Sequence, residues 1–416
     1  MRNLLLNALL ILIANSALSE SIVIRNVDIY ESSGVRENVS VYVVDGIIKN
    51  IDSLIFQTAD IEIDATNKTL TGGLFNGETH IGTVEVGAIT STVDFHTDDD
   101  EVTASFKPSD SFNPNSTLIP HNRVHGLTHA LLTPEAESHM IAGQAAIVEL
   151  GNSPKVINSS VGVVIDYTEH GVSLMGNSRS SAMAKLKLAF DDARDFSRNR
   201  KAALLGDHRD YELSLADLYA LEHVISGDKP IIVRVARSSD ILDILEFAKE
   251  FQLKLILSGV AEGWMVADQI AEANIPVIMD PIYNLPTAYE NLGSRLDNAA
   301  LLHKSGVQLI FTGMGWHNTH SAYLVRQSAG NAVTNGLPKE AAIAAITSSP
   351  AEIFQIGYSG KIREGELANF VLWSGDPLEV TSEAELVMIA GEKIAMTSRS
   401  LQLRDRYFNE IKNQLN

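Results

Sequence analysis

The chain has 416 residues, of which 45% are apolar, and a formal charge of −20 from 32 basic and 52 acidic side chains. This length and apolar content predict a large buried core and more than one compact unit. The excess of acid excludes nucleic acids and anionic membranes as expected partners, because both are negatively charged. The sequence has no cysteine, so it forms no disulfide and offers no cysteine for lipidation.

Residues 1–19 have the pattern of a secretory signal peptide. Arg2 provides a positive start, residues 4–13 are apolar apart from Asn7, and residues 17–19 offer a small-residue cleavage site. The alternative is a membrane anchor, but the apolar run is much shorter than the roughly 20 residues that span a bilayer. We therefore expect export to a bacterial periplasm and no membrane contact after the signal is removed.

The segment 74–82 contains the first candidate for chemistry. It follows a Gly-rich turn at 71–73 and enters a short apolar strand. Side chains two apart on a strand face the same way, so Glu78 and His80 are predicted to point to one side of that strand.

A polar stretch precedes the next apolar strand, which is predicted at 124–132. Arg123 has the geometry to clamp a carboxylate, and Asn122 and Gln144 are suited to read amides. The alternative is that these side chains tie loops to the rest of the fold.

His121, His125 and His129 are spaced by four residues, which suggests a metal-binding helix face. The apolar residues around them favour a strand, in which side chains four apart are about 13 Å from each other. Both interpretations stay open at this point.

Apolar strands and amphipathic helical stretches alternate through the second half of the chain. This alternation is typical of parallel β/α units. A helix is predicted to start at 238–240, directly after one of these strands. The predicted strands are 231–235, 255–257, 276–279 and 307–312.

These segments resemble the amidohydrolase superfamily, in particular its exported imidazolonepropionase-like branch. Residues 27–30 and 41–48 resemble its opening strands, with Asp45-Gly46 as a tight turn, and residues 361–378 resemble its closing strand motif. The resemblance implies an α/β fold, with a (β/α)8 TIM-like barrel of the metal-dependent hydrolase type and a small β-sandwich formed by both chain ends. The implied order is a signal peptide at 1–19, sandwich at 20–70, barrel at 71–355, and sandwich with a terminal helix at 356–416.

The resemblance also implies where a divalent metal would bind. In that family two histidines after strand one, histidines after strands five and six, and an aspartate after strand eight hold the ion at the carboxyl ends of the strands. Here His80 matches, Glu78 replaces the first histidine, and Ala236, Gly259 and Gly315 provide no donor side chain. We therefore expect a degenerate site with no cofactor. The alternative is one zinc-like ion in a rebuilt site at His80 and Glu78.

Two functions remain open for the barrel. By resemblance, the first is hydrolysis of a C–N bond in a cyclic or peptide-like amide; without a metal, Glu78 would be the general base. The second is a catalytically inactive solute-binding protein or subunit, either as a homo-oligomer or paired with an active paralogue. The ligand in either case is a small amide or peptide-like molecule. The predicted catalytic residues are Glu78, His80 and His317, and the predicted substrate-binding residues are Arg123, Gln144 and Asn318.

Overall fold

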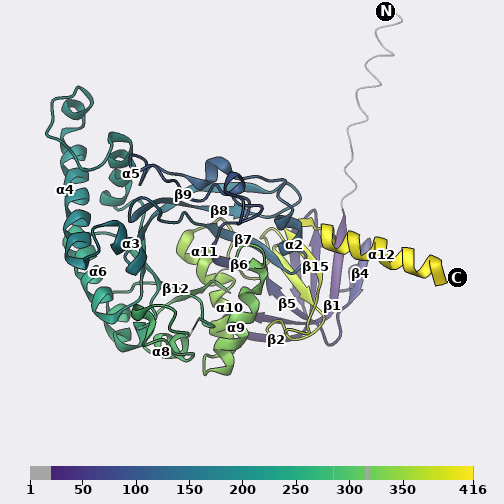
Figure 1. Ribbon diagram of the computed structural model, residues 1–416. Coiled ribbons are helices and arrows are strands. Elements are labelled where there is room, and N and C mark those ends of the chain that lie inside the picture. Colours follow the sequence, from purple (N-terminus) through teal and green to yellow (C-terminus); the bar gives the residue numbers. More distant parts are fainter. Residues whose placement is uncertain (1–19, 284, 314–317, 416) are drawn as a thin grey trace, which may run out of the picture.

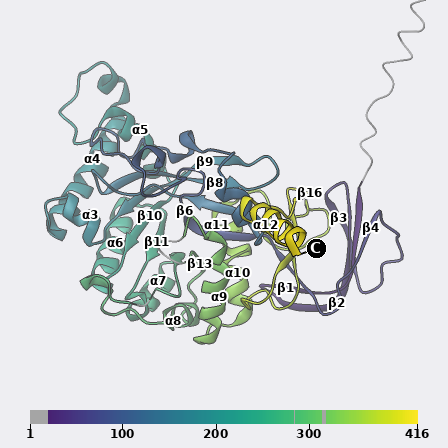
Figure 2. The same ribbon diagram turned by 45° about the vertical axis from the view of Figure 1, so that its right-hand side comes forward.

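The computed structural model describes residues 20–283, 285–313 and 318–415 (Figure 1). It contains an eight-stranded barrel with helices around it, and a second eight-stranded sheet built from both ends of the chain. Figure 2 shows the second sheet beside the barrel. The predicted α/β fold, with a barrel and a β unit shared by the two chain ends, is confirmed. Within the described ranges, no helix is long and apolar enough to cross a membrane.

The second sheet is one mixed sheet that curls over its own core, where the sequence predicted a sandwich. Asp45 and Gly46 have φ of 52° and 71°, which confirms the predicted tight turn between its second and third strands. Strands β14 and β5 are antiparallel neighbours and join the two chain ends. The sheet order is β16(Glu392–Lys393), β15(Ala384–Ile389), β14(Phe370–Trp373), β5(Thr69–Gly72), β1(Ser21–Glu31), β2(Gly34–Val44) and β3(Ile47–Asp52), and β4(Ile61–Asp64) pairs with β1.

Trp373 packs between this sheet and the barrel. Its side chain is 1% exposed, and its indole N–H donates to Thr71 Oγ1 at 2.9 Å. Its ring lies so close to Gly126 that a Cβ there would come within 2.6 Å of it. We predict that Trp373→Ala lowers the free energy of unfolding by about 3–5 kcal/mol, because it leaves a large cavity. Trp373→Phe should cost less in urea denaturation, and equal losses for the two variants would contradict this account.

The barrel strands follow one another around the ring in chain order. The four strands predicted in the second half of the chain are confirmed as β10 to β13. β6 passes close to β13, since a Cβ on Gly77 would lie 2.9 Å from the Phe311 carbonyl oxygen. The strands are β6(Leu74–Thr79), β7(Leu127–Leu132), β8(Ile141–Glu149), β9(Lys155–Asp166), β10(Ile231–Val235), β11(Leu255–Gly259), β12(Val277–Met279) and β13(Leu309–Phe311).

Most helices follow the barrel strands, and α12 extends away from the body at the C-terminal end (Figure 1). The predicted helix start at 238–240 is confirmed by α6, which begins at Ser238. The helices are α2(Leu118–Arg123), α3(Glu169–Leu174), α4(Arg179–Leu204), α5(Leu215–Ile225), α6(Ser238–Phe251), α7(Ala267–Glu272), α8(Asn298–Lys304), α9(Val325–Thr334), α10(Lys339–Ala345), α11(Ser348–Phe354) and α12(Arg399–Leu415).

One barrel strand departs from the all-parallel pattern of a (β/α)8 barrel. β8 is antiparallel to both β7 and β9. The connections at 133–140 and 150–154 are too short for a parallel crossover, which needs about a dozen residues or more. The three strands therefore form a meander inside the barrel wall.

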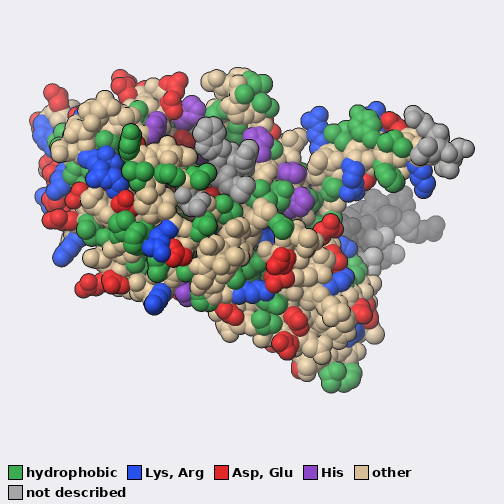
Figure 3. Space-filling model, turned by 60° about the horizontal axis from the view of Figure 1, so that its bottom comes forward, with side chains coloured by type: hydrophobic (Ala, Val, Ile, Leu, Met, Phe, Trp, Pro, Cys, Tyr) green, Lys and Arg blue, Asp and Glu red, His purple; other side chains and the backbone are tan. Residues whose placement is uncertain are grey.

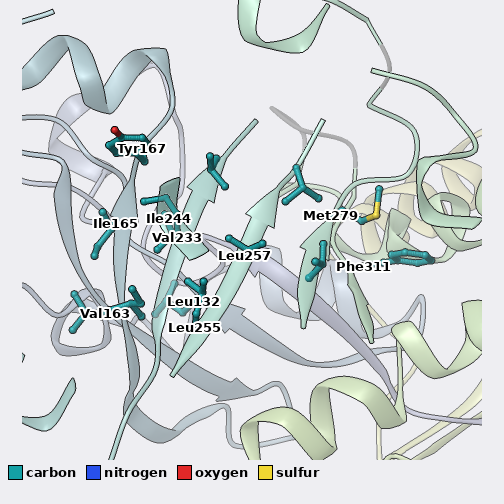
Figure 4. Close-up of a cluster of buried hydrophobic side chains, with 14 of the residues drawn as sticks. Leu132, Val163, Ile165, Tyr167, Val233, Ile244, Leu255, Leu257, Met279 and Phe311 are labelled. Carbon is teal, nitrogen blue, oxygen red and sulfur yellow. The ribbon is translucent and has the colours of Figure 1, made fainter. Parts of the chain in front are cut away.

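Two apolar layers fix the barrel, one inside it and one between it and the helices. Figure 4 shows part of the outer layer, in which side chains of β9 to β13 pack with Ile244 of α6. The inner layer includes Phe75, Leu131, Val164, Ile232, Ile256, Ile278 and Ile310. On six strands a polar residue follows the inner apolar residue two positions later and so faces the same way. These residues are Thr133, Asp166, Arg234, Ser258, Asp280 and Thr312.

Candidate functional site

A cavity of about 600 Å³ opens above the inner apolar layer, where most barrel strands have their carboxyl ends. Barrel proteins place their functional groups at this end. Its walls contain five of the six polar residues that follow the inner apolar layer on the barrel strands, namely Thr133, Arg234, Ser258, Asp280 and Thr312. The other walls include Glu78, His80, Phe95, Glu135, Ala236, Gly259, Met279, Tyr283, Glu290, Arg295, Asn298 and Asn318.

The guanidinium of Arg234 lies between two carboxylates of the cavity. Its Nη1 is 2.7 Å from Glu135 Oε2, and its Nε is 3.5 Å from Glu78 Oε2. The Ser258 hydroxyl donates to Glu78 Oε1 at 2.8 Å. Both oxygens of Glu78 therefore have partners, and β6, β10 and β11 are linked by charge and hydrogen bonds.

His80, which directly follows β6, lies next to this ion pair. Its Nε2 is 3.0 Å from Glu135 Oε1. The imidazole also stacks on Phe95, with ring centroids 3.8 Å apart and planes 10° apart. These two contacts fix the ring at the cavity wall, and the structure brings Glu78 and His80 together through Glu135 and Arg234.

The electrostatics of Glu135 depend on these neighbours. Burial on its own raises the pKa of this carboxyl, but the Arg234 charge and the His80 hydrogen bond outweigh it and lower the pKa to about 2. A folded-state pKa below the ordinary value means that the contacts stabilise the fold above the ordinary pKa and lose this effect as the pH falls.

We predict that Glu135→Gln lowers the stability at neutral pH, and that its difference from the parent shrinks as the pH falls from about 4.5 to about 2. Urea midpoints at a series of pH values measure this difference. Glu137→Gln is the control, because Glu137 is exposed and outside the ion-pair network. A Glu135→Gln difference that stays constant over this range would contradict the assignment.

Glu290, on the short helical turn η4(Tyr289–Asn291), is a second perturbed carboxylate at the mouth. Burial raises its pKa to about 7. Glu290 Oε2 accepts from the Glu169 backbone N–H at 2.8 Å, and Glu169 Oε1 accepts from the Glu290 N–H at 3.0 Å. Arg179 Nη2 lies 3.3 Å from Glu290. These contacts tie the loop after β12 to α3 and α4 across the mouth.

Asn318 lines the cavity, but its side-chain amide is already hydrogen-bonded to other residues of the protein. Its Nδ2 donates to the Glu78 carbonyl and to Thr312 Oγ1, the latter at 2.7 Å, and its Oδ1 accepts from Asn76 Nδ2 at 2.7 Å. Asn318 therefore supports the backbone that carries Glu78.

Arg123 and Gln144 are not among the residues that line the cavity. Arg123 Nη1 donates to the Gly151 carbonyl at 2.6 Å. Gln144 is 5% exposed; its Nε2 donates to the Ala104 carbonyl at 3.0 Å, and its Oε1 accepts from Ser160 Oγ. These contacts agree with the loop-tying alternative.

The three histidines spaced by four do not share one face. His121 belongs to α2, His125 follows that helix and stacks on Tyr323 with centroids 4.2 Å apart, and His129 is buried in β7. A helical metal face at these positions is therefore wrong, because the chain changes from helix to strand between them.

At the family positions after β10 and β11, the described residues offer no metal donor. Ala236 and Gly259 lie at the cavity wall after β10 and at the end of β11, whereas Gly315 and His317 fall outside the described residues. Across the residues that the structure describes, no three His, Cys, Asp or Glu side chains come together so that they could hold a metal ion. The described donors therefore do not fit the ion that this fold implies.

Glu135, Arg234 and Ser258 belong to the site but were not predicted from the sequence. A signal existed for Arg234, which is the single charged residue in the otherwise apolar strand 231–235. Glu135 lies in a loop three residues after β7, and nothing in its local sequence marks it.

A barrel with a polar cavity at the carboxyl ends of its strands is the arrangement in which TIM-barrel proteins place their functional groups. The model of the amidohydrolase family matches residues 183–397, more than half of the chain, so the chain belongs to the amidohydrolase family.

Similar proteins agree with this assignment. Amidohydrolase tasK from Hapsidospora irregularis is 21% identical over 363 residues, which cover 79% of this chain and 36% of that protein. This chain thus spans about a third of the length of that relative. The crystal structure of an amidohydrolase from Thermotoga maritima MSB8 matches with a TM-score of 0.79 and 23% identity over 90% of this chain and 99% of that one. An adenosine deaminase from Xanthomonas campestris with bound zinc matches with a TM-score of 0.52 and 14% identity over 94% and 98% of the two chains. At these identities the structural matches show the fold alone.

Proposed function

We propose that this chain binds a small amide or peptide-like molecule in the barrel cavity and does not hydrolyse it through a metal. The observation that carries the proposal is the position of Arg234, whose guanidinium occupies the space between Glu78 and Glu135. A positive charge of the protein itself therefore lies where a cation would meet these carboxylates.

This charge is permanent. Burial on its own lowers the pKa of Arg234, but the carboxylates of Glu135 and Glu78 raise it above the ordinary value. A guanidinium does not lose its proton in proteins, so it cannot make room for a metal by becoming neutral. Entry of a divalent ion would place it against a fixed positive charge and break both ion pairs.

Metal-free hydrolysis is the less well supported alternative. A general base must reach the proton that it removes, and both oxygens of Glu78 already have partners in Ser258 and Arg234. With a pKa of about 2, Glu135 is a poor base at neutral pH.

The cavity walls suit an amide-like ligand. Phe95, Met279 and Tyr283 provide apolar surface, and Thr133 and Asn298 provide donors and acceptors. Such a mixture of apolar walls and few polar groups is typical of small-molecule sites. The names of the similar amidohydrolases support the amide class.

We also propose the branch of the family to which the chain belongs and its location in the cell. We assign the chain to the exported imidazolonepropionase-like branch, on the sequence of residues 113–129 and 141–144, and we assign it to the periplasm, on residues 1–19. Its metal positions would then have degenerated within that branch.

The test is the metal content and ligand response of the chain after growth with added zinc and manganese. We expect metal well below one equivalent per chain, a rise in melting temperature with some members of a panel of dipeptides and cyclic amides, and recovery of these compounds unchanged. Stoichiometric metal together with product formation would overturn the proposal. No stabilisation by any compound would leave the amide class unsupported.

A further inference from the structure

The C-terminal helix α12 extends from the body with its apolar side chains exposed. Figure 1 shows it extending beyond the rest of the fold, and Figure 3 shows hydrophobic side chains on the same projection at the right. It touches the body at its base, through α2. Within the described residues, Leu403, Tyr407, Phe408 and Ile411 are 39%, 55%, 68% and 57% exposed.

These side chains form one stripe along the helix. Leu403, Tyr407 and Ile411 are spaced by four, and Phe408 lies beside them, so all four share a face. The helix has 17 residues and no alanine. Isolated helices of about this length are marginal in water even when rich in alanine, and they gain stability mainly by packing an apolar face. The stripe therefore needs a partner surface.

We propose that the stripe pairs with α12 of a second copy of this chain, antiparallel and centred on Tyr407. In this arrangement Leu403 faces Ile411 of the second copy, and Tyr407 faces its own counterpart. Arg404 then lies at the same level along the pair as Glu410 of the second copy, so opposite charges attract across the apolar contact at both of its ends. The helix is thus self-complementary in shape and in charge.

The charged side chains are free to make these contacts. Arg404 pairs with its neighbour Asp405, and Arg406 with Glu410 at 3.2 Å, in pairs that are more than half exposed. Exposed pairs of this kind contribute little to stability and rearrange readily. The contact of two such helices is smaller than a standard interface of about 1,600 Å², so the dimer is expected to be reversible.

A membrane is a poorer occupant of the stripe. The chain has a formal charge of −20, which outweighs the four basic and two acidic side chains of α12 itself. An anionic lipid surface would repel the body that α12 would have to bring to it.

Cysteine cross-linking tests the register, because the chain has no cysteine of its own. Helices packed about 8–10 Å apart bring facing Cα atoms close enough for a disulfide. Tyr407→Cys in the full chain should give a covalent dimer on mild oxidation. Asn409→Cys, about 200° around the same helix, should stay monomeric on a non-reducing gel. Cross-linking of neither variant, or of both equally, would overturn the proposal.

Charge reversal tests the same contact without a thiol. In sedimentation velocity, Arg404→Glu and Glu410→Arg should each weaken dimerisation by about tenfold, since symmetry repeats the repulsion twice. The double variant should recover the affinity of the parent. A double variant as weak as the singles, a parent that is monomeric throughout a concentration series, or a parent that stays monomeric and binds phosphatidylserine vesicles would overturn the proposal.

Discussion

Replacing Arg234 with alanine should lower the free energy of unfolding by about 3 kcal/mol at neutral pH. The substitution leaves Glu78 and Glu135 without the charge that lies between them, and removing one partner of a buried ion pair typically costs about 3–5 kcal/mol. The lower end applies because Glu135 is partly open to the cavity. The midpoint of urea denaturation measures this loss.

The same variant should gain affinity for divalent metal. Without the guanidinium, the carboxylates of Glu78 and Glu135 lack the positive charge between them, and a divalent cation that enters this space would neutralise them. Zinc should therefore raise the melting temperature of Arg234→Ala and leave that of the parent unchanged. Equal zinc responses of the parent and the variant would contradict the role assigned to Arg234.

Two further variants control for this experiment. Arg237→Ala removes an exposed guanidinium that contacts Ser239 and Asp240, and we expect a change within about 0.5 kcal/mol and no zinc response. Arg234→Lys keeps the charge but cannot bridge two carboxylates through separate nitrogens of one plane, so it should recover only part of the stability.

Much of the fold could be predicted from sequence periodicity and turn chemistry. Short apolar runs followed by amphipathic stretches identified β10 to β13, and Asp45-Gly46 identified a tight turn. The direction of β8 could not be predicted in this way. An apolar run such as 141–149 has the same pattern in either direction, and only the short connections beside it exclude a parallel crossover.

The site was predictable only in part, because its contacts are distant in sequence. Glu78 and His80 follow from one strand and its alternation. Ser258 reaches Glu78 across 180 positions, and the partner of His80 lies in the loop after β7. The pattern of one sequence does not indicate which side chains meet across the interior of a barrel. A charged residue within an apolar strand, as Arg234 is, was the one local sign that a side chain faces a polar interior.

Filling the cavity should abolish ligand binding while the fold remains. Ala236 is 5% exposed and lies at the cavity wall directly after β10. An indole at this position would occupy space that the proposed ligand needs, because small-molecule sites enclose most of the ligand surface. Ligand at about one hundred times its Kd stabilises a protein by about 2.7 kcal/mol, and Ala236→Trp should lose essentially all of this.

The unliganded variant separates this effect from a damaged fold. If the indole enters the cavity, Ala236→Trp without ligand should melt close to the parent temperature. If it is forced into the packed wall, overpacking should cost about 1–3 kcal/mol. Ala236→Ser is the matched control, since it adds one hydroxyl and should keep the ligand-induced rise in melting temperature. A parent-like ligand response in Ala236→Trp would place the binding site outside the barrel cavity, because the ligand and the indole cannot share the same volume.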